Sequence, residues 1–313
     1  MMRVALAIDL GGTETRAALV GDDGRFLAEE RAPTRANDGP DAVIADMAAM
    51  AARLRAGRPD IAPIGIGVGA PGPLDGEAGI SIAPPTLAGW RDVPLAARLA
   101  AATGLKARVE NDANAAALGE WSFGAGVGTR DMVFVTVSTG IGGGVIAEGR
   151  LLRGRRGLAG EIGHMAIAAD SKLRCACGAL GCFEALASGT ALGQAADALA
   201  RSGGAPALLE RAAGGPVTAR HVGQAARAGD ATALALLDQE ARWLGIGFVN
   251  LLHLYSPEMI VVGGGVGQLL DLLLPGIRRE IEARAMIAYR DVPVVPAELG
   301  DRAGLVGAAG LVF

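Results

Sequence analysis

Cysteine, aromatic residues and runs of like charge are all scarce in this sequence of 313 residues. The sequence carries no export signal, and in the cytoplasm a cluster of its three cysteines indicates metal binding or redox chemistry rather than disulfides. The net charge is −4, and no block of five like charges occurs, which argues against a nucleic-acid partner.

Long hydrophobic runs are also missing. The longest apolar neighbourhood, LGIGFVNLLHLY, contains Asn250 and His253 and is too short to span a membrane. The N-terminal apolar run is short and is interrupted by Asp9, unlike a signal peptide. We therefore expect a cytoplasmic protein with no membrane partner.

Glycine, by contrast, is abundant, and it clusters between apolar runs. Residues 4–27 and 133–154 share one plan of strand, glycine-rich turn, strand, turn and strand, which indicates two duplicated halves. Helical patterns at 41–57, 230–257 and 267–285 alternate with further strands. The sequence therefore predicts an α/β architecture, and it is long enough for two domains.

The glycine turns predict a polyphosphate site. DLGGT (9–13) offers backbone N–H groups and a hydroxyl, and its aspartate at a strand end suits Mg²⁺ bound through water. STGIGGG (138–144) would bind the same ligand from the other half, and VGGGVG (262–267) suits ribose or adenine. The Walker A motif and the protein-kinase signatures are missing. We expect the nucleotide at Asp9, Gly11, Gly12, Thr13, Thr139, Gly140 and Gly264.

Asp112, in ENDANAAALGE, lies where a strand meets a helix N-terminus. Asparagine and aspartate are preferred helix caps, so a purely structural role is one interpretation. The same position keeps a carboxylate ionised, so that it could accept a proton from an attacking hydroxyl during phosphoryl transfer. The motif alone leaves both interpretations open.

All three cysteines fall within eight positions, and a histidine precedes them. His164 with Cys175, Cys177 and Cys182 forms the donor set of a closed, tetrahedral, structural Zn²⁺ site. The alternative, three reduced and unbound thiols, is harder to reconcile with their grouping. The other two histidines, His221 and His253, are interpreted as core residues.

Taken together, these motifs resemble the ROK family of repressors and kinases, in particular its sugar kinases. DLGGTETR, ENDANAAALGE, STGIGGGV, GEIGH and CACGALGCFE occur in the family's order across nearly the whole chain. The resemblance implies an actin-like, ribonuclease-H-like ATPase fold with two α/β domains flanking a cleft that binds ATP and sugar. We expect a smaller domain at 1–112 plus 299–313 and a larger one, carrying the zinc loop, at 113–298.

The resemblance also implies residue roles. Asp112 would be the catalytic base, and the loop near Gly72 would close over the substrate. Zinc on one nitrogen of His164 would leave the other for a sugar hydroxyl. Arg16 matches the family pattern at the ATP site, whereas Glu14 departs from it. The sugar ligands implied are Asn111, Asp112, Glu161, His164 and Glu184.

These expectations converge on an ATP-dependent hexose 6-kinase acting on glucose, with Mg²⁺ and structural Zn²⁺. The base, the imidazole and the phosphate turns are predicted to meet in one crevice. An N-acetylmannosamine or N-acetylglucosamine kinase is the alternative, because Thr86 stands roughly where glucose kinases often have Asn. A sugar-responsive transcriptional regulator is a further alternative, but it needs a DNA-binding module, and the first strand already begins at Arg3. The resemblance suggests a homodimer or homotetramer.

Overall fold

The computed structural model describes residues 2–313. The chain forms two compact units, each described separately below. The first unit comprises residues 1–129, 144–160 and 298–313, and the second comprises residues 130–143 and 161–297.

The first unit is built on a five-stranded sheet with the order β3-β2-β1-β4-β7. A small two-stranded sheet, β5-β6, belongs to the same unit. Its strands are β1 (Val4–Leu10), β2 (Glu14–Gly21), β3 (Phe26–Pro33), β4 (Ile66–Ala70), β5 (Leu74–Asp75), β6 (Ile80–Ser81), β7 (Ala107–Asn111) and β10 (Arg150–Leu151). Its helices are α1 (Gly39–Gly57), α2 (Leu95–Thr103), α3 (Asp112–Phe123), η1 (Arg155–Gly157), η4 (Gly300–Arg302) and α11 (Ala303–Gly310).

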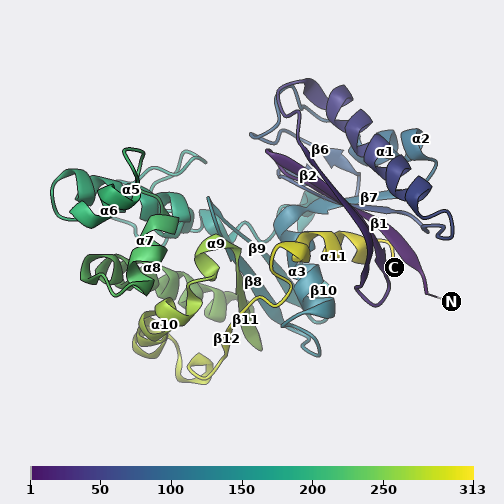
Figure 1. The fold of residues 1–313 in the computed structure, drawn as a ribbon. Helices are drawn as coiled ribbons and strands as arrows, with labels where there is room; N and C mark the ends of the chain where they lie inside the picture. Colours follow the sequence, from purple (N-terminus) through teal and green to yellow (C-terminus); the bar gives the residue numbers. More distant parts are fainter. Residues whose placement is uncertain (1) are drawn as a thin grey trace. The chain divides into compact units, whose positions relative to one another are not determined.

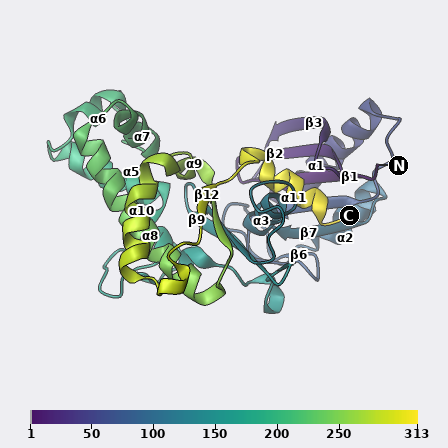
Figure 2. The same cartoon turned by 90° about the horizontal axis from the view of Figure 1, so that it is seen from below.

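The strand β1 is buried on both faces, and its sequence assigns a different partner to each. Successive side chains of a strand point to opposite faces. Leu6 and Ile8 join the core formed with α1 and α2, whereas Ala5 and Ala7 pack with Leu305 and its neighbours in α11. The small alanines let α11 come close to the sheet, and α3 lies beside α11 in both ribbon views (Figures 1 and 2).

The second unit combines strands of a second sheet with a group of helices. That sheet has the order β10-β9-β8-β11-β12, and β9 begins in the second unit and ends in the first. The strands are β8 (Met132–Val137), β9 (Ile141–Ala147), β11 (Met259–Gly263) and β12 (Val294–Pro296). The helices are η2 (Ile162–His164), α4 (Phe183–Ala187), α5 (Gly189–Arg201), α6 (Pro206–Arg211), α7 (Ala219–Arg227), α8 (Ala231–Tyr255), α9 (Gly264–Gly267), α10 (Leu270–Arg284) and η3 (Ile287–Tyr289).

The predicted α/β architecture and the paired hairpins are confirmed. The turns after β1 and after β8 both connect antiparallel strands, as the sequence repeat indicates. The division into units differs from the predicted one. A boundary after Asp112 would cut α3 from the sheet, but α3 packs on α11 and stays in the first unit, together with residues 144–160. The N-terminal unit is therefore not the smaller of the two.

Between residues 2 and 313, the structure has no helix both long enough and apolar enough to cross a bilayer.

Candidate functional site

The carboxyl ends of the parallel strands β1, β4 and β7 form one edge of the first sheet. Asp9 is paired with Gly69 in register, and Gly69 is paired with Glu110. A Cβ at Gly69 would lie 3.9 Å from Asp9 Oδ1 and 3.8 Å from Asp112 Cα. Asp9 and Asp112 therefore both lie next to Gly69. The structure brings together the two predicted residues, as expected for strand ends in an α/β sheet.

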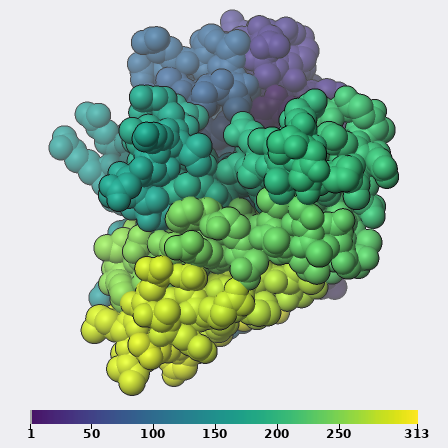
Figure 3. Space-filling model, turned by 90° about the vertical axis from the view of Figure 1, so that its left-hand side faces the viewer, coloured from purple at the N-terminus to yellow at the C-terminus, as the bar shows by residue number. Residues whose placement is uncertain are grey.

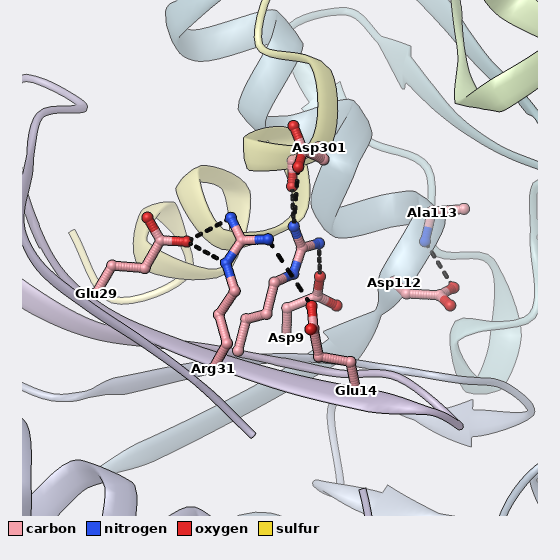
Figure 4. Close-up of polar contacts among 8 residues, drawn as sticks. Asp9, Glu14, Glu29, Arg31, Asp112, Ala113 and Asp301 are labelled. Atoms are coloured by element: carbon pink, nitrogen blue, oxygen red, sulfur yellow. Dashed lines mark hydrogen bonds and ion pairs between the residues drawn. The ribbon is translucent and has the colours of Figure 1, made fainter. Parts of the chain in front are cut away.

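Asn111 and Asp112 occupy different positions at the start of α3. The helix cap is Asn111, whose Oδ1 accepts hydrogen bonds from the backbone N–H groups of Ala113 and Asn114 at 2.9 and 3.1 Å. Asp112 is the first helical residue, and its Oδ1 accepts from Ala113 N at 2.8 Å (Figure 4). Because Asn111 supplies the cap, the structural interpretation of Asp112 as the cap is wrong.

The turn at Gly11, Gly12 and Thr13 is tight, as predicted. Gly11 N donates to the Glu14 carbonyl at 3.0 Å, which closes the hairpin between β1 and β2. A Cβ at Gly12 would lie 2.9 Å from the Cβ of Thr86, so the turn also contacts the loop after β6. Glycine is therefore required at position 12 by close approach.

Arg16 lies at the predicted nucleotide site, but its partners are protein groups. Its guanidinium donates to Asp9 Oδ2 and to the backbone carbonyl of Asp301, the latter at 2.6 Å. Both Arg16 and Asp9 are mostly buried, with 16% side-chain exposure each. Arg16 therefore fixes the Asp9 carboxylate and joins it to the segment that precedes α11; Asp9 and Asp301 are labelled in Figure 4.

Glu14, the departure from the family pattern, is directed toward a cation. Arg31 Nη1 lies 3.9 Å from Glu14 Oε1, and Arg31 also binds Glu29 at 2.8 Å (Figure 4). The hydrogen bond to Glu29, with its charge, raises the pKa of Arg31. Arg31 therefore partly balances the negative charge that Glu14 brings to the glycine turn.

The loop after β4 contains Gly72, which precedes Pro73 through a cis peptide bond. Further along this loop, a Cβ at Gly76 would lie 3.0 Å from the Val109 carbonyl, so the loop packs on the end of β7. Gly72 therefore belongs to a loop that packs on the end of β7, directly before Asp112, within the first unit.

In the second unit, the predicted thiol cluster is assembled. One ligand atom from each of His164, Cys175, Cys177 and Cys182 lies within 4.8 Å of every other. Cys177 Sγ and Cys182 Sγ are 3.7 Å apart, and all three cysteines are free. Three thiols and an imidazole at this spacing fit the tetrahedral donor set of a structural metal site.

The two ring nitrogens of His164 have different neighbours. Its Nδ1 lies 3.5 Å from Cys175 Sγ, whereas its Nε2 lies 4.0 Å from Glu161 Oε2. Burial raises the pKa of the Cys175 thiol to about 12, so a nearby cation is needed for its thiolate to form at neutral pH. The geometry therefore fits metal ligation by Nδ1 and leaves Nε2 on the Glu161 side.

Glu184 joins the thiol cluster to a glycine turn. Its Oε2 accepts from the backbone N–H of Ile141 at 3.0 Å, and its Oε1 lies 3.6 Å from Cys175 Sγ. A Cβ at Gly140 would lie 2.4 Å from the same Oε2, so a side chain there would displace the Glu184 carboxylate. The sequence analysis assigned Glu184 to sugar alone and missed this contact with the STGIGGG turn.

A pocket of about 1190 Å³ lies wholly within the second unit. Ser138, Thr139 and Gly265 line it, so two of the predicted glycine turns contribute. Gly140 and Gly264 are not among its lining residues; Gly264, at φ +83°, instead packs against the Val137 carbonyl. Figure 3 draws the part of the sequence around residues 190–230 in green. The remaining lining includes side chains from this part: Gln194, Asp197, Arg201, Thr218, Arg220, Gln224 and Arg227.

Sequence reasoning missed the α5–α7 wall of this pocket. These helices carry no motif; the available signal is the amphipathic pattern of α7, whose Val222 and Ala226 are buried while Arg220 and Gln224 are exposed. Arg201 and Arg227 form ion pairs with Asp197 and Asp271, so their charges are already matched.

Comparison with known proteins identifies the family to which the chain belongs. The model of the ROK family matches residues 5–313. The chain belongs to the ROK family. Among ROK proteins, it is 38% identical to a glucokinase from Halalkalibacterium halodurans, with 98% of this chain and 94% of that protein covered.

Solved ROK structures have the same fold. A ROK family glucokinase from Streptomyces griseus, in complex with glucose and AMPPNP, has a TM-score of 0.83 and 36% identity, with 98% of each chain covered. A protein from Listeria monocytogenes, provisionally described as an N-acetylmannosamine kinase, has a TM-score of 0.79 and 26% identity and covers 100% of this chain and 98% of its own. The predicted actin-like ATPase fold is thereby confirmed.

Proposed function

We propose that this ROK protein is an ATP-dependent glucokinase that transfers the γ-phosphoryl group to the 6-hydroxyl of glucose. The observation that carries the proposal is the glucokinase likeness over almost the full length of both chains, at 38% identity. Two further observations support it: Asp9 and Asp112 both lie next to Gly69 in the first unit, and the predicted thiol cluster is assembled in the second.

Asp112 is the proposed catalytic base. Its position in the first turn of α3 places the carboxylate at the positive end of the helix dipole. In the reaction the carboxylate accepts the proton of the 6-hydroxyl as that oxygen attacks the γ-phosphorus. A weak base suffices, since a loose phosphoryl-transfer transition state depends mainly on orientation and charge stabilisation.

ATP would use backbone donors of the glycine turns together with the pocket of the second unit. The proposed contacts are Gly11, Gly12 and Thr13 in the first unit and Thr139, Gly140 and Gly264 in the second. A Mg²⁺ ion would neutralise phosphate charge as it does in other phosphoryl-transfer enzymes. Asp9, whose carboxylate Arg16 holds in place, would bind that ion through water.

Zinc is the proposed occupant of the thiol cluster. The Cys₃His donor set offers no open position, so the ion would be structural. His164 would use Nδ1 for the ion and Nε2 for a sugar hydroxyl, and Glu161 is 4.0 Å from that Nε2. Asn111, Glu161 and Glu184 complete the proposed sugar ligands, while the loop at Gly72 would close over the sugar.

The sugar is tested by measuring ADP release from ATP with glucose, mannose, fructose, allose, N-acetylmannosamine and N-acetylglucosamine. The proposal predicts the highest kcat/KM for glucose. A preference of more than tenfold for any other sugar contradicts the glucose assignment, and no ADP release with any of them contradicts the kinase.

An N-acetylhexosamine kinase is the second candidate. It is favoured by the structural likeness to the Listeria protein and by the exposed Thr86 beside Gly12. The same panel of sugars separates the two candidates, since a pocket that accepts an N-acetyl group at C2 would give N-acetylmannosamine or N-acetylglucosamine the larger kcat/KM.

A cytoplasmic location and a homodimer or homotetramer are also part of the proposal. The use of ATP and the need for reduced thiols at the metal site support the cytoplasm. Light scattering of the purified protein at several concentrations measures the oligomeric state, and a monomer at every concentration contradicts this part.

A further inference from the structure

A buried carboxylate, Glu110, lies directly beside the turn that carries the proposed base Asp112. Glu110, in β7, has only 1% of its side chain exposed. Its Oε1 accepts hydrogen bonds from the backbone N–H of Asn111 at 3.1 Å and from Asn114 Nδ2 at 3.0 Å. Both donors flank Asp112, so Glu110 holds the turn on either side of the proposed base.

A single arginine from a distant segment balances this buried charge. Arg153 Nε donates to Glu110 Oε2 at 2.7 Å, and no other ion pair of Glu110 occurs within residues 2–313. Arg153 keeps 46% of its side chain exposed, so it approaches Glu110 from the solvent side. Without this cation, Glu110 would be a buried and uncompensated carboxylate, which a protein avoids by rearranging or hydrating the site.

The segment that carries Arg153 rests on the substrate loop. Residues 153–159 close on themselves through a hydrogen bond from Ala159 N to the Arg153 carbonyl at 3.0 Å. A Cβ at Gly157 would lie 3.2 Å from the Leu74 carbonyl and 3.4 Å from Gly76 N, so this segment lies on the loop after β4. A Cβ at Gly76 would in turn lie 3.6 Å from Glu110 Oε2.

We propose that Arg153 is a positioning residue: its ion pair with Glu110 docks the segment 152–160 and the substrate loop 71–79 on the catalytic turn 110–114, and so fixes the orientation of Asp112. The inference rests on the proposed function for its kinetic consequence. Its structural consequence, the docking of segment 152–160, does not depend on which reaction the protein catalyses.

The test compares Arg153→Met with Arg150→Met, a matched control three residues away on the exposed side of β10. Loss of the ion pair misorients the base, and displacements of about 1 Å cost on the order of 100-fold. We expect kcat with ATP and glucose to fall by about 10- to 100-fold in Arg153→Met, as for other residues that orient catalytic groups. Arg150→Met should stay within twofold of the unsubstituted protein, and Arg153→Lys should recover part of the loss.

A second readout uses the two arginines within the docked segment. Trypsin cleavage after Arg155 and Arg156, followed by mass spectrometry, reports how often residues 152–160 leave the turn. We expect cleavage at least fivefold faster in Arg153→Met and in Glu110→Gln than in Arg150→Met. Thermal unfolding of both variants is measured alongside, because Glu110 without its cation also destabilises the fold. New cleavage confined to Arg155 and Arg156 at a temperature well below unfolding shows that the opening is local.

Two outcomes overturn the inference. Equal cleavage rates in Arg153→Met and Arg150→Met show that no docking depends on the ion pair, whether or not the protein phosphorylates any sugar. Faster cleavage with kcat within twofold of the unsubstituted protein shows that the docked segment does not position the base. Failure of the proposed function is distinguished from both, because it is seen as absent ADP release in the unsubstituted protein.

Discussion

At the scale of single residues, adjacent polar side chains at the start of α3 have separate roles. Asn111 satisfies two backbone donors of the helix, and this leaves Asp112 at the N-terminus without the capping duty. The motif ENDAN predicts the strand-to-helix turn, but it does not say which of two good capping residues caps. That choice depends on the backbone of Asn111, whose extended conformation at φ −58° and ψ 144° suits the cap.

The burial of Glu240 in α8 is not predicted by the sequence. This residue is 2% exposed, and its Oε1 has no hydrogen-bond partner in the described chain. Burial raises its pKa to about 8, so the folded protein holds a proton there that the unfolded chain releases above its ordinary pKa of about 4.3. The free energy of unfolding therefore falls as pH rises from about 4 to about 8.

Glu240→Gln should remove this pH-dependent penalty. We expect the variant to gain roughly 1–3 kcal/mol over the unsubstituted protein at pH 8 and to gain less at pH 5, because the buried charge is the cost that is removed. Urea unfolding at both pH values measures it, with the exposed Glu282→Gln as control. An equal shift of the midpoint at pH 5 and pH 8 would show that Glu240 does not titrate in this range.

At the scale of elements, α3 and α11 pack through glycine and alanine. A Cβ at Gly307 would lie 1.6 Å from the Ala115 carbonyl, and one at Gly119 would lie 2.3 Å from the Ala303 carbonyl. The two helices approach so closely that no side chain fits between them at these points. The sequence predicts both helices, but the small residues that pair them lie 184 and 192 positions apart, so their contact is not visible in the pattern.

Gly307→Ala should separate α3 from α11. We expect destabilisation of roughly 1–3 kcal/mol, the usual cost of overpacking, with a loss of kcat because α3 carries Asp112. Gly310→Ala in the same helix is the control: nothing lies within 4 Å of its Cβ position, and alanine favours helix. Urea unfolding of the two variants measures the destabilisation. Equal midpoints would mean that the two helices can move apart without loss of unfolding free energy.

At the scale of the whole molecule, the glycine repeat correctly predicts both hairpins, and CACGALGCFE with GEIGH correctly predicts which four residues form the thiol cluster. Two features could not be predicted from the sequence. The α5–α7 wall of the pocket uses surface residues such as Gln194 and Arg220, which belong to no motif; the amphipathic pattern of α7 predicts a helix but not a pocket. The division into units depends on α3 packing against the C-terminal helix α11, which is a tertiary contact.

The metal connects folding and function in this account. We expect one zinc ion per chain by elemental analysis. After its removal by a chelator we expect a lower unfolding temperature and weaker glucose binding, because the proposed ion would hold His164 and the loop of Glu184. Cys177→Ser should reproduce both losses, whereas His253→Gln should keep the metal. A zinc-free protein with unchanged stability and glucose affinity would rule out this role.

The central claim, that Asp112 is the base of an ATP-dependent glucokinase, is tested most directly by Asp112→Asn. The measurement is ADP release with saturating ATP and glucose, paired with calorimetric glucose binding to the same sample. The account predicts that kcat falls by about 10²- to 10⁴-fold, the usual contribution of a general base, while glucose affinity stays within threefold. ADP release within twofold of the unsubstituted protein would contradict it.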